Sequence, residues 1–379
     1  MSSAMIPLFD VQITAEDRQA VAQCLESGWV STAGPTIAEF EQAIGNVIKV
    51  KRVLATSTGT AALHLALQVE GVGAGDWVLL PSTTFVATAN AVSMLGAKCI
   101  FVDVDSQHYN LCLQDLKRTL IEVRQQGIKP KALLMVHLLG HTGDIFGIQN
   151  FCKQEGLLLI EDAAQCLGAT AKGQALGSFG CVATTSFNGN KIVTSGGGGA
   201  VMSDDDRLID RCRFLSQQAR VPGGEYIHDE VGFNYRLPNL NAALGLSQIK
   251  RLPQLIETKR KIFETYRAGL SDLKGVRLVE SPEGVNSNHW MPVISLDSRV
   301  IQKTTDQIKN EMQQKQIAIG KFYFPMHLQK PFLNNEVKRA LPISEKIYRQ
   351  TLVLPYAVTL SGAQQAQILQ TLRDVLHGT

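Results

Sequence analysis

Short apolar runs alternate with amphipathic patterns through the first half of the chain. The runs are bounded by glycine, proline or polar residues, which is the pattern of strands. Helical patterns such as TAALHLALQVEG and DIFGIQNFCKQEG separate most of them. Because the runs are apolar throughout, they predict a mostly parallel α/β sheet covered by helices on both faces. The predicted strands cover residues 53–56, 77–81, 98–104, 131–138, 156–162, 182–187 and 199–204.

Two further helices are predicted ahead of the first apolar run. One covers TAEDRQAVAQCLESG, with Thr14 as its N-terminal cap and Gly28 at its end. In TIAEFEQAIGNV, Thr36 and Glu39 have the spacing of a capping box, so we expect the second helix to begin there. The segment GWVSTAGP between them is expected to form a loop.

The pattern changes beyond Asn239. A long helical stretch is broken near Pro253, and the strand patterns VRLVE and HWMPVISL follow. The chain then gives a polar helix, TTDQIKNEMQQKQ, and a last helix after Ser361. We therefore expect a large α/β domain over 1–249 and a smaller α+β domain over 250–379.

Composition excludes several classes of protein. The chain is 45% hydrophobic and 19% charged, with a net charge of +3 and no dense stripe of Lys and Arg, so nucleic acid is not an expected partner. No apolar run approaches the roughly 20 residues that span a bilayer. The N-terminus has no signal-peptide pattern, and seven cysteines are scattered without a CxxC pair. These features favour a cytoplasmic protein with reduced thiols.

Candidate chemistry lies where the predicted strands end, because ligands of open α/β sheets gather at the carboxyl ends of the strands. The sequence STGTAA opens directly into a helix, and its small residues and free N–H groups suit a phosphate. A plain helix cap is the alternative. After the next strand comes Phe85, which could stack on a flat ring or pack in the core.

Two more strand ends carry charged residues. Asp162 ends an apolar strand, where a buried carboxylate needs a cation or strong donors unless it caps a helix. Lys191 follows Ser186 and precedes four consecutive glycines, where a solvated surface charge is the alternative. A phosphate cradle, an aromatic plate, a carboxylate and a lysine together indicate pyridoxal 5'-phosphate (PLP). The lysine would bond to the cofactor, and the aspartate would keep its ring nitrogen protonated.

Seven motifs resemble the DegT/DnrJ/EryC1/StrS family of nucleotide-sugar aminotransferases, which are PLP enzymes of fold type I. The resemblance covers nearly the whole chain and rests on ESGWVSTAGP, STGTAALHLAL, PSTTFVATANAV, VHLLGHTGD, LIEDAAQCLGA, SFNGNKIVTSGGGGAV and VGFNYRLPNLNAALG. It implies that Lys191 is the Schiff-base lysine, that Asp162 pairs with the pyridine nitrogen and that Gln165 contacts the ring hydroxyl. It also implies a homodimer with two shared active sites.

The resemblance assigns the remaining contacts as well. Phe85 would stack on the cofactor ring, and Asn234 would reach the phosphate from the neighbouring subunit. The phosphate contacts within the same chain would be Gly59, Thr60 and Ser186. The residues that would line the sugar site are Trp29, Ser31, Thr32 and His327, with Tyr323 in the same C-terminal segment.

The variant SFNGNK, together with QARVPGGEYIHDEVGFNYR, is similar to enzymes that aminate UDP-4-keto-6-deoxy-N-acetylglucosamine for surface glycans. Glutamate is the expected amino donor. One alternative is a dehydratase on the same fold that uses pyridoxamine phosphate, but such relatives carry histidine in place of the lysine. A regulatory protein that binds PLP or a sugar without turnover is another. No metal is expected, because His137 and His141 straddle a strand end without a further ligand at suitable spacing.

Overall fold

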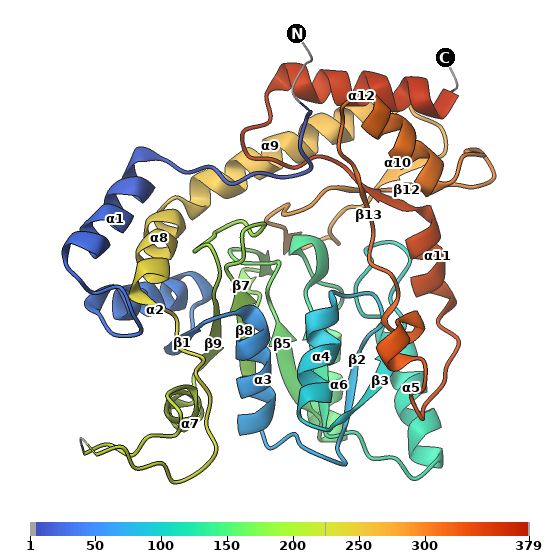
Figure 1. The fold of residues 1–379 in the computed structure, drawn as a ribbon. Coiled ribbons are helices and arrows are strands. Elements are labelled where there is room, and N and C mark those ends of the chain that lie inside the picture. Colours follow the sequence, from blue (N-terminus) through green and yellow to red (C-terminus); the bar gives the residue numbers. More distant parts are fainter. Residues whose placement is uncertain (1–4, 224, 378–379) are drawn as a thin grey trace.

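The computed structural model describes residues 5–223 and 225–377, and within these the core is a seven-stranded sheet (Figure 1). The order is β1-β9-β8-β5-β4-β2-β3, and β9 alone in this sheet runs antiparallel to its neighbours. Every predicted strand of the large domain is confirmed. The strands are β1 (Arg52–Thr56), β2 (Trp77–Pro81), β3 (Lys98–Val102), β4 (Ala132–Val136), β5 (Leu158–Asp162), β8 (Val182–Ser186) and β9 (Gly199–Ser203).

Helices cover both faces of this sheet, as the unbroken apolar strands predicted. On one face, α3 (Gly59–Val69), α4 (Val86–Met94) and α7 (Asp206–Ser216) share a buried cluster with strand residues such as Leu80 and Leu134. On the other face, α2 (Pro35–Ile48), α5 (Leu113–Gln125) and α6 (Ile145–Glu155) pack against Leu79 and Leu133. Alternate residues of one strand therefore enter opposite core layers.

The first two helices begin differently from each other. In α1 (Ala15–Glu26) the Thr14 side chain accepts from the Asp17 backbone N–H, and the Asp17 side chain accepts from the Thr14 backbone N–H. The predicted cap at Thr14 is therefore confirmed. The predicted Thr36–Glu39 capping box is wrong. Helix α2 begins at Pro35 with Gly34 as its cap, because proline fits the first helical position and Gly34 adopts a φ of +141°. Thr36 thus lies inside the first turn.

The C-terminal part builds on a second sheet. Helices α8 (Asn239–Lys250) and α9 (Leu252–Leu270) meet at Arg251, with Pro253 in the first turn of α9. The sheet order is β10-β12-β14-β13, and Ile6 from the other end of the chain belongs to its core cluster. The division at 249/250 stays a prediction. The other elements here are β10 (Val276–Leu278), β12 (Val293–Leu296), β13 (Gly320–Lys321), β14 (Thr351–Val353), α10 (Thr305–Gln314), α11 (Pro342–Gln350) and α12 (Gly362–His377).

Short elements join the two sheets. A small sheet of order β11-β6-β7 contains β6 (Thr170–Ala171), β7 (Gln174–Ala175) and β11 (Val285–Asn286). Single 3-10 turns are η1 (Leu138–Gly140), η2 (Met326–Leu328) and η3 (Lys330–Phe332). Through β11, residues beyond α9 pair with a segment that follows β5, so the C-terminal part is anchored close to the strand that ends in Asp162.

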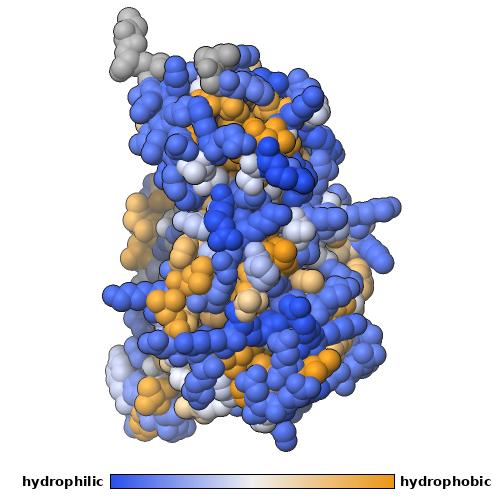
Figure 2. Space-filling model, turned by 90° about the vertical axis from the view of Figure 1, so that its right-hand side faces the viewer, coloured by the Kyte–Doolittle hydropathy of each residue, from blue (hydrophilic) through white to orange (hydrophobic). Residues whose placement is uncertain are grey.

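The surface is mostly polar on the face drawn in Figure 2, with apolar side chains in separate patches. Among the described residues, no helix combines the length and the apolar character that crossing a membrane requires. All seven cysteines carry free thiols, and five of them are buried.

Candidate active site

A cavity of about 270 Å³ lies at the carboxyl ends of the central strands. It brings together residues that follow β1, β2, β5 and β8, as expected for an open α/β sheet. Of the eight residues predicted to bind or bond to the cofactor, all except Asn234 line this one cavity. They are Gly59, Thr60, Phe85, Asp162, Gln165, Ser186 and Lys191.

The part of the cavity that is suited to a phosphate is formed by the start of α3 and the end of β8. Thr58 caps α3 by accepting the Ala61 N–H at 3.0 Å, which leaves the first-turn N–H groups directed toward the helix end. A Cβ atom on Gly59 would lie 2.9 Å from the Cβ of Ser186. Glycine therefore permits the helix start to approach Ser186, and together they form a concave set of donors suited to an anion.

Asp162 is a buried, fixed carboxylate. Its Oδ2 accepts from the Thr88 hydroxyl at 2.8 Å, and its Oδ1 accepts from the Ala164 N–H at 3.2 Å. The residues after Asp162 form turns rather than a helix, so the helix-cap alternative does not hold. Burial raises the pKa of this carboxyl, while the bond from Thr88 opposes the rise. A cationic N–H placed in the cavity would stabilise the ionised form.

Gln165 and Tyr323 form a polar wall of the cavity. Gln165 accepts the Leu139 N–H at 2.9 Å through Oε1 and donates to the Tyr323 hydroxyl at 3.4 Å through Nε2. Burial raises the pKa of Tyr323, which keeps the phenol protonated. Phe85 is 56% exposed, and the centre of its ring lies 6.5 Å from the centre of the Tyr323 ring. Phe85 is thus a cavity residue, and the core-packing alternative does not hold.

Lys191 enters the cavity from the loop after β8. Its Nζ lies 4.4 Å from the centre of the Trp290 ring, and the Trp290 Nε1 donates to the Asn190 carbonyl at 2.8 Å. Burial lowers the pKa of Lys191 to about 8, and the negative charge of Asp162 limits the fall. Lys191 is therefore not a loose surface charge, and an appreciable fraction of its amine is neutral near physiological pH.

The glycine run after Lys191 brings β9 against the cradle. A Cβ atom on Gly199 would lie 2.6 Å from the backbone of Thr58 and Gly59. Gly196 and Gly198 have φ values of +77° and +130°, which side chains disfavour. Glycine is required here by both space and backbone conformation.

Five predicted residues lie outside this cavity within one chain. Asn234 is exposed, and so are Trp29, Ser31 and Thr32 in the loop between α1 and α2. Asn239 holds that loop, since it bonds the carbonyls of Trp29 and Ser31. His327 instead contacts Ser82 through Nδ1 at 2.7 Å.

Two further residues shape the site without having been predicted to do so. Thr88 orients Asp162 and is itself hydrogen-bonded to the Thr84 hydroxyl at 2.9 Å. The i, i+4 spacing of these two threonines at the start of a helix is the signal in the sequence that could have indicated their contact. Trp290 contacts Lys191 from a segment 99 positions away in the sequence, where no local pattern signals a site.

The two histidines considered as metal ligands have other partners. His137 Nε2 lies 2.6 Å from Glu161 Oε2, and His141 Nδ1 lies 3.0 Å from the Asn110 amide. Glu161 also accepts backbone N–H groups from the 177–180 turn, so this pair anchors a turn on the far face of the sheet. Across residues 5–223 and 225–377, no group of three or more potential metal ligands gathers.

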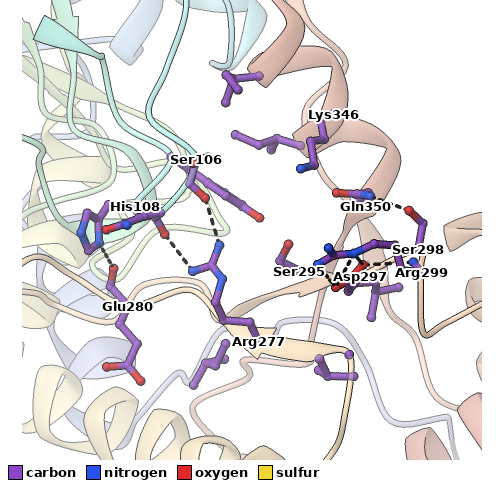
Figure 3. Close-up of a pocket in the computed structure, with 18 residues that line it drawn as sticks. Ser106, His108, Arg277, Glu280, Ser295, Asp297, Ser298, Arg299, Lys346 and Gln350 are labelled. Carbon is purple, nitrogen blue, oxygen red and sulfur yellow. Dashed lines mark hydrogen bonds and ion pairs between the residues drawn. The ribbon is translucent and has the colours of Figure 1, made fainter. Parts of the chain in front are cut away.

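A second, larger cavity differs in character from the strand-end cavity. This cavity has a volume of about 1040 Å³ and lies between the 106–109 loop, the second sheet and α11; Figure 3 shows residues that line it. Arg277 donates there to the carbonyls of Ser106 and Gln107, and Arg299 is paired with Asp297. Most of its charged groups are thus already satisfied by the chain itself.

The residues of the strand-end cavity fit PLP. A protonated ring nitrogen would stabilise the ionised form of the buried Asp162 carboxyl, and the α3–Ser186 cradle suits the phosphate. Phe85 offers a ring face, and Lys191 offers an amine within the same cavity. The fit rests on charge complementarity and on the close approach at Gly59.

Comparison with known proteins gives concordant results. The family model described as the DegT/DnrJ/EryC1/StrS aminotransferase family matches residues 11–373. A GDP-perosamine synthase from Vibrio cholerae is 34% identical over 98% of this chain and 100% of its own length. A dTDP-4-dehydro-2,3,6-trideoxy-D-glucose 4-aminotransferase from Saccharopolyspora spinosa is 33% identical over 95% and 94%. A crystal structure of a DegT/DnrJ/EryC1/StrS aminotransferase from Brucella abortus superposes with a TM-score of 0.88 at 32% identity, covering 95% of each chain.

Proposed function

The chain belongs to the DegT/DnrJ/EryC1/StrS aminotransferase family, and we propose that it transfers an amino group from glutamate to the ketone of a nucleotide-linked 4-keto-6-deoxy sugar. Aminotransferases of this family depend on PLP. The observation that carries the proposal is the presence of Lys191 and Asp162 in one cavity with an anion cradle. Bound PLP would supply an electron sink for the proton transfers and would carry the amino group between the two halves of the reaction.

The chain's own residues have distinct parts in this proposal. Asp162, held by Thr88, would provide the negative charge that keeps the ring nitrogen protonated. The first turn of α3 and Ser186 would bind the phosphate. Lys191 would move a proton between carbon atoms of the bound reactants, which requires an amine that can be neutral.

We propose that the active enzyme is a homodimer with shared active sites. Asn234 is exposed and lies outside the cavity of its own chain, as expected for a residue that serves a neighbour. The segment between α7 and α8, which contains Asn234, projects from the body at the lower left of Figure 1. Its Tyr226 and Val231 are both 84% exposed, which is unusual for large apolar side chains unless they are covered in an assembly.

For the substrate, we propose UDP-4-keto-6-deoxy-N-acetylglucosamine. The support is the SFNGNK variant at the lysine together with the 218–236 segment. The name of the S. spinosa relative places its ketone at carbon 4, which agrees with this position. A GDP-linked sugar is the second candidate, because the relative from V. cholerae is named for one.

The alternatives without amination are opposed by Lys191. A dehydratase of this fold would carry histidine at this position, and a protein that binds only a sugar would need neither Lys191 nor Asp162 beside an anion cradle. A regulatory protein that holds PLP without turnover would not release 2-oxoglutarate from glutamate. The test is to add glutamate to the PLP-loaded protein and to follow the visible cofactor band and the release of 2-oxoglutarate. Loss of the band with stoichiometric 2-oxoglutarate supports the proposal. An unchanged band, or equal release by the Lys191→Ala protein, contradicts it.

A further inference from the structure

Lys191 lies where two cavities meet. It lines the strand-end cavity together with Asp162, and it also lines a small rear cavity of about 20 Å³. The rear cavity is bounded by residues of the N-terminal segment, α9 and the stretch after β14, among them Asp10, Lys259 and Tyr356. The lysine is thus located where the large sheet and its loops meet the smaller C-terminal part.

Trp290 forms the contact surface for the lysine at this junction. It precedes β12 and is 1% exposed. Its Nε1 donates to the Asn190 carbonyl, and its ring meets the Tyr356 ring edge-on at 6.0 Å. These contacts fix the indole on two sides, while the Nζ of Lys191 lies 4.4 Å from its ring centre.

We propose that Trp290 is a positioning residue, which holds the Lys191 ammonium over its ring whenever the lysine is not bonded to the cofactor. The inference rests on the proposed role of Lys191. A flexible four-carbon side chain released into a cavity could adopt many rotamers, and attraction to a fixed ring face restricts them. The amine then stays beside the atoms to which it must return.

The aromatic ring of Trp290 suits the holding of the Lys191 amine better than a carboxylate would. A ring face attracts an ammonium group but accepts no proton, so the seat does not bind the neutral amine with comparable strength. The neutral form can therefore leave for the cofactor. The titratable groups around the amine are Asp162 and Cys166 on the β5 side and Tyr323 in the strand-end cavity. Around the rear cavity they are Asp10, Lys259 and Tyr356.

The experiment uses Trp290 as a reporter in the cofactor-free protein. Trp29 and Trp77 are replaced by phenylalanine, because both lie outside the two cavities and leave Trp290 as the single indole. Emission is recorded from neutral to alkaline pH. We expect a change with a midpoint near the lowered pKa of Lys191, about 8, that Lys191→Met abolishes and Lys259→Met preserves, since Lys259 lies over Tyr356 instead.

The same pH-dependent emission change in the Lys191→Met protein, or no such change in the parent, would contradict the proposed contact between Lys191 and Trp290. PLP binding and 2-oxoglutarate release, measured separately, report on the proposed function, so the two can fail independently.

A second comparison separates the effect of the Trp290 ring on Lys191 from an effect on folding. Trp290→Phe keeps a ring face and Trp290→Leu removes it, while both lose the Nε1 bond and part of the volume of the indole. Without the ring face the ammonium form is less favoured, so acylation of Lys191 at neutral pH should be about threefold faster or more in the Leu protein than in the Phe protein. Unfolding midpoints identify any difference due to stability. Equal acylation rates in two folded variants would contradict the proposal.

Discussion

Thr88 donates its hydroxyl to Oδ2 of Asp162 at 2.8 Å, and both residues are buried. The bond links the start of α4 to the end of β5, so the carboxylate keeps one orientation in the cavity. It also lowers the pKa of Asp162 against the effect of burial. A residue outside the cavity lining thus sets both the direction and the charge of the group that faces the cofactor.

Replacing Thr88 by valine should weaken PLP binding by about tenfold or more, because a buried carboxylate then loses a donor worth about 1.5–3 kcal/mol. The pKa of Asp162 rises further, so less of it is ionised at neutral pH. The matched variant Thr88→Ser keeps the hydroxyl and should bind PLP nearly as the parent does. Equilibrium dialysis gives the dissociation constants. Equal constants for the valine and serine proteins would show that the bond has no such role.

The rate at which the cofactor-free protein captures PLP should rise with pH and level off above about 8, where Lys191 becomes neutral. Protonated lysine is not nucleophilic, so below this pH the rate should increase about tenfold per unit. Stopped-flow absorbance measures it. An ordinary lysine titrates at about 10.4, and a rate that continues to climb to that pH would contradict the buried environment of Lys191.

Gly199→Ala should destabilise the fold by about 1–3 kcal/mol or more, because its Cβ would meet the backbone of Thr58 and Gly59 at 2.6 Å. The control is Gly189→Ala in the loop before Lys191, where an added Cβ meets nothing within 4 Å. Chemical denaturation gives both free energies of unfolding. If Gly199→Ala also retains full PLP affinity, the close approach of β9 to the backbone of Thr58 and Gly59 has no role in binding the cofactor.

Shared active sites predict complementation between two inactive proteins. Lys191→Ala lacks the amine and Asn234→Ala lacks the proposed contact to the neighbour's phosphate. A mixed dimer of the two contains one site with both residues intact. Co-expressed and purified with separate tags, it should recover activity that neither variant shows alone. Activity no greater than the sum of the separate proteins would mean that Asn234 serves its own chain or no site.

Much of the fold follows from sequence because most strands of the large sheet are short apolar runs, although β8 contains Thr184 and Thr185. Parallel strands also place their carboxyl ends at one edge, which is why Phe85, Asp162 and Lys191 could be expected together. Local rules failed where two signals competed. At the start of α2, Pro35 and Gly34 determine the helix boundary, and the capping spacing at Thr36 has no effect.

Contacts between distant segments could not be predicted in the same way. Trp290 reaches Lys191 only because the C-terminal part packs against the loop after β8, and its own neighbours in the sequence resemble an ordinary strand. His327 shows that a residue expected at the site from its sequence segment can have a different partner in the fold. It lies in a segment expected to line the sugar site, yet its ring bonds Ser82 outside the cavity.

The central claim is that this chain transfers the glutamate amino group to a nucleotide-linked 4-keto sugar through Lys191. The most direct measurement incubates the PLP-loaded protein with ¹⁵N-glutamate and separate UDP-, dTDP- and GDP-linked 4-keto-6-deoxy sugars, followed by mass spectrometry of the products. We predict ¹⁵N in an amino sugar, most from the UDP-4-keto-6-deoxy-N-acetylglucosamine reaction, and none with Lys191→Ala. Label in no sugar, or equal label with Lys191→Ala, would contradict the account.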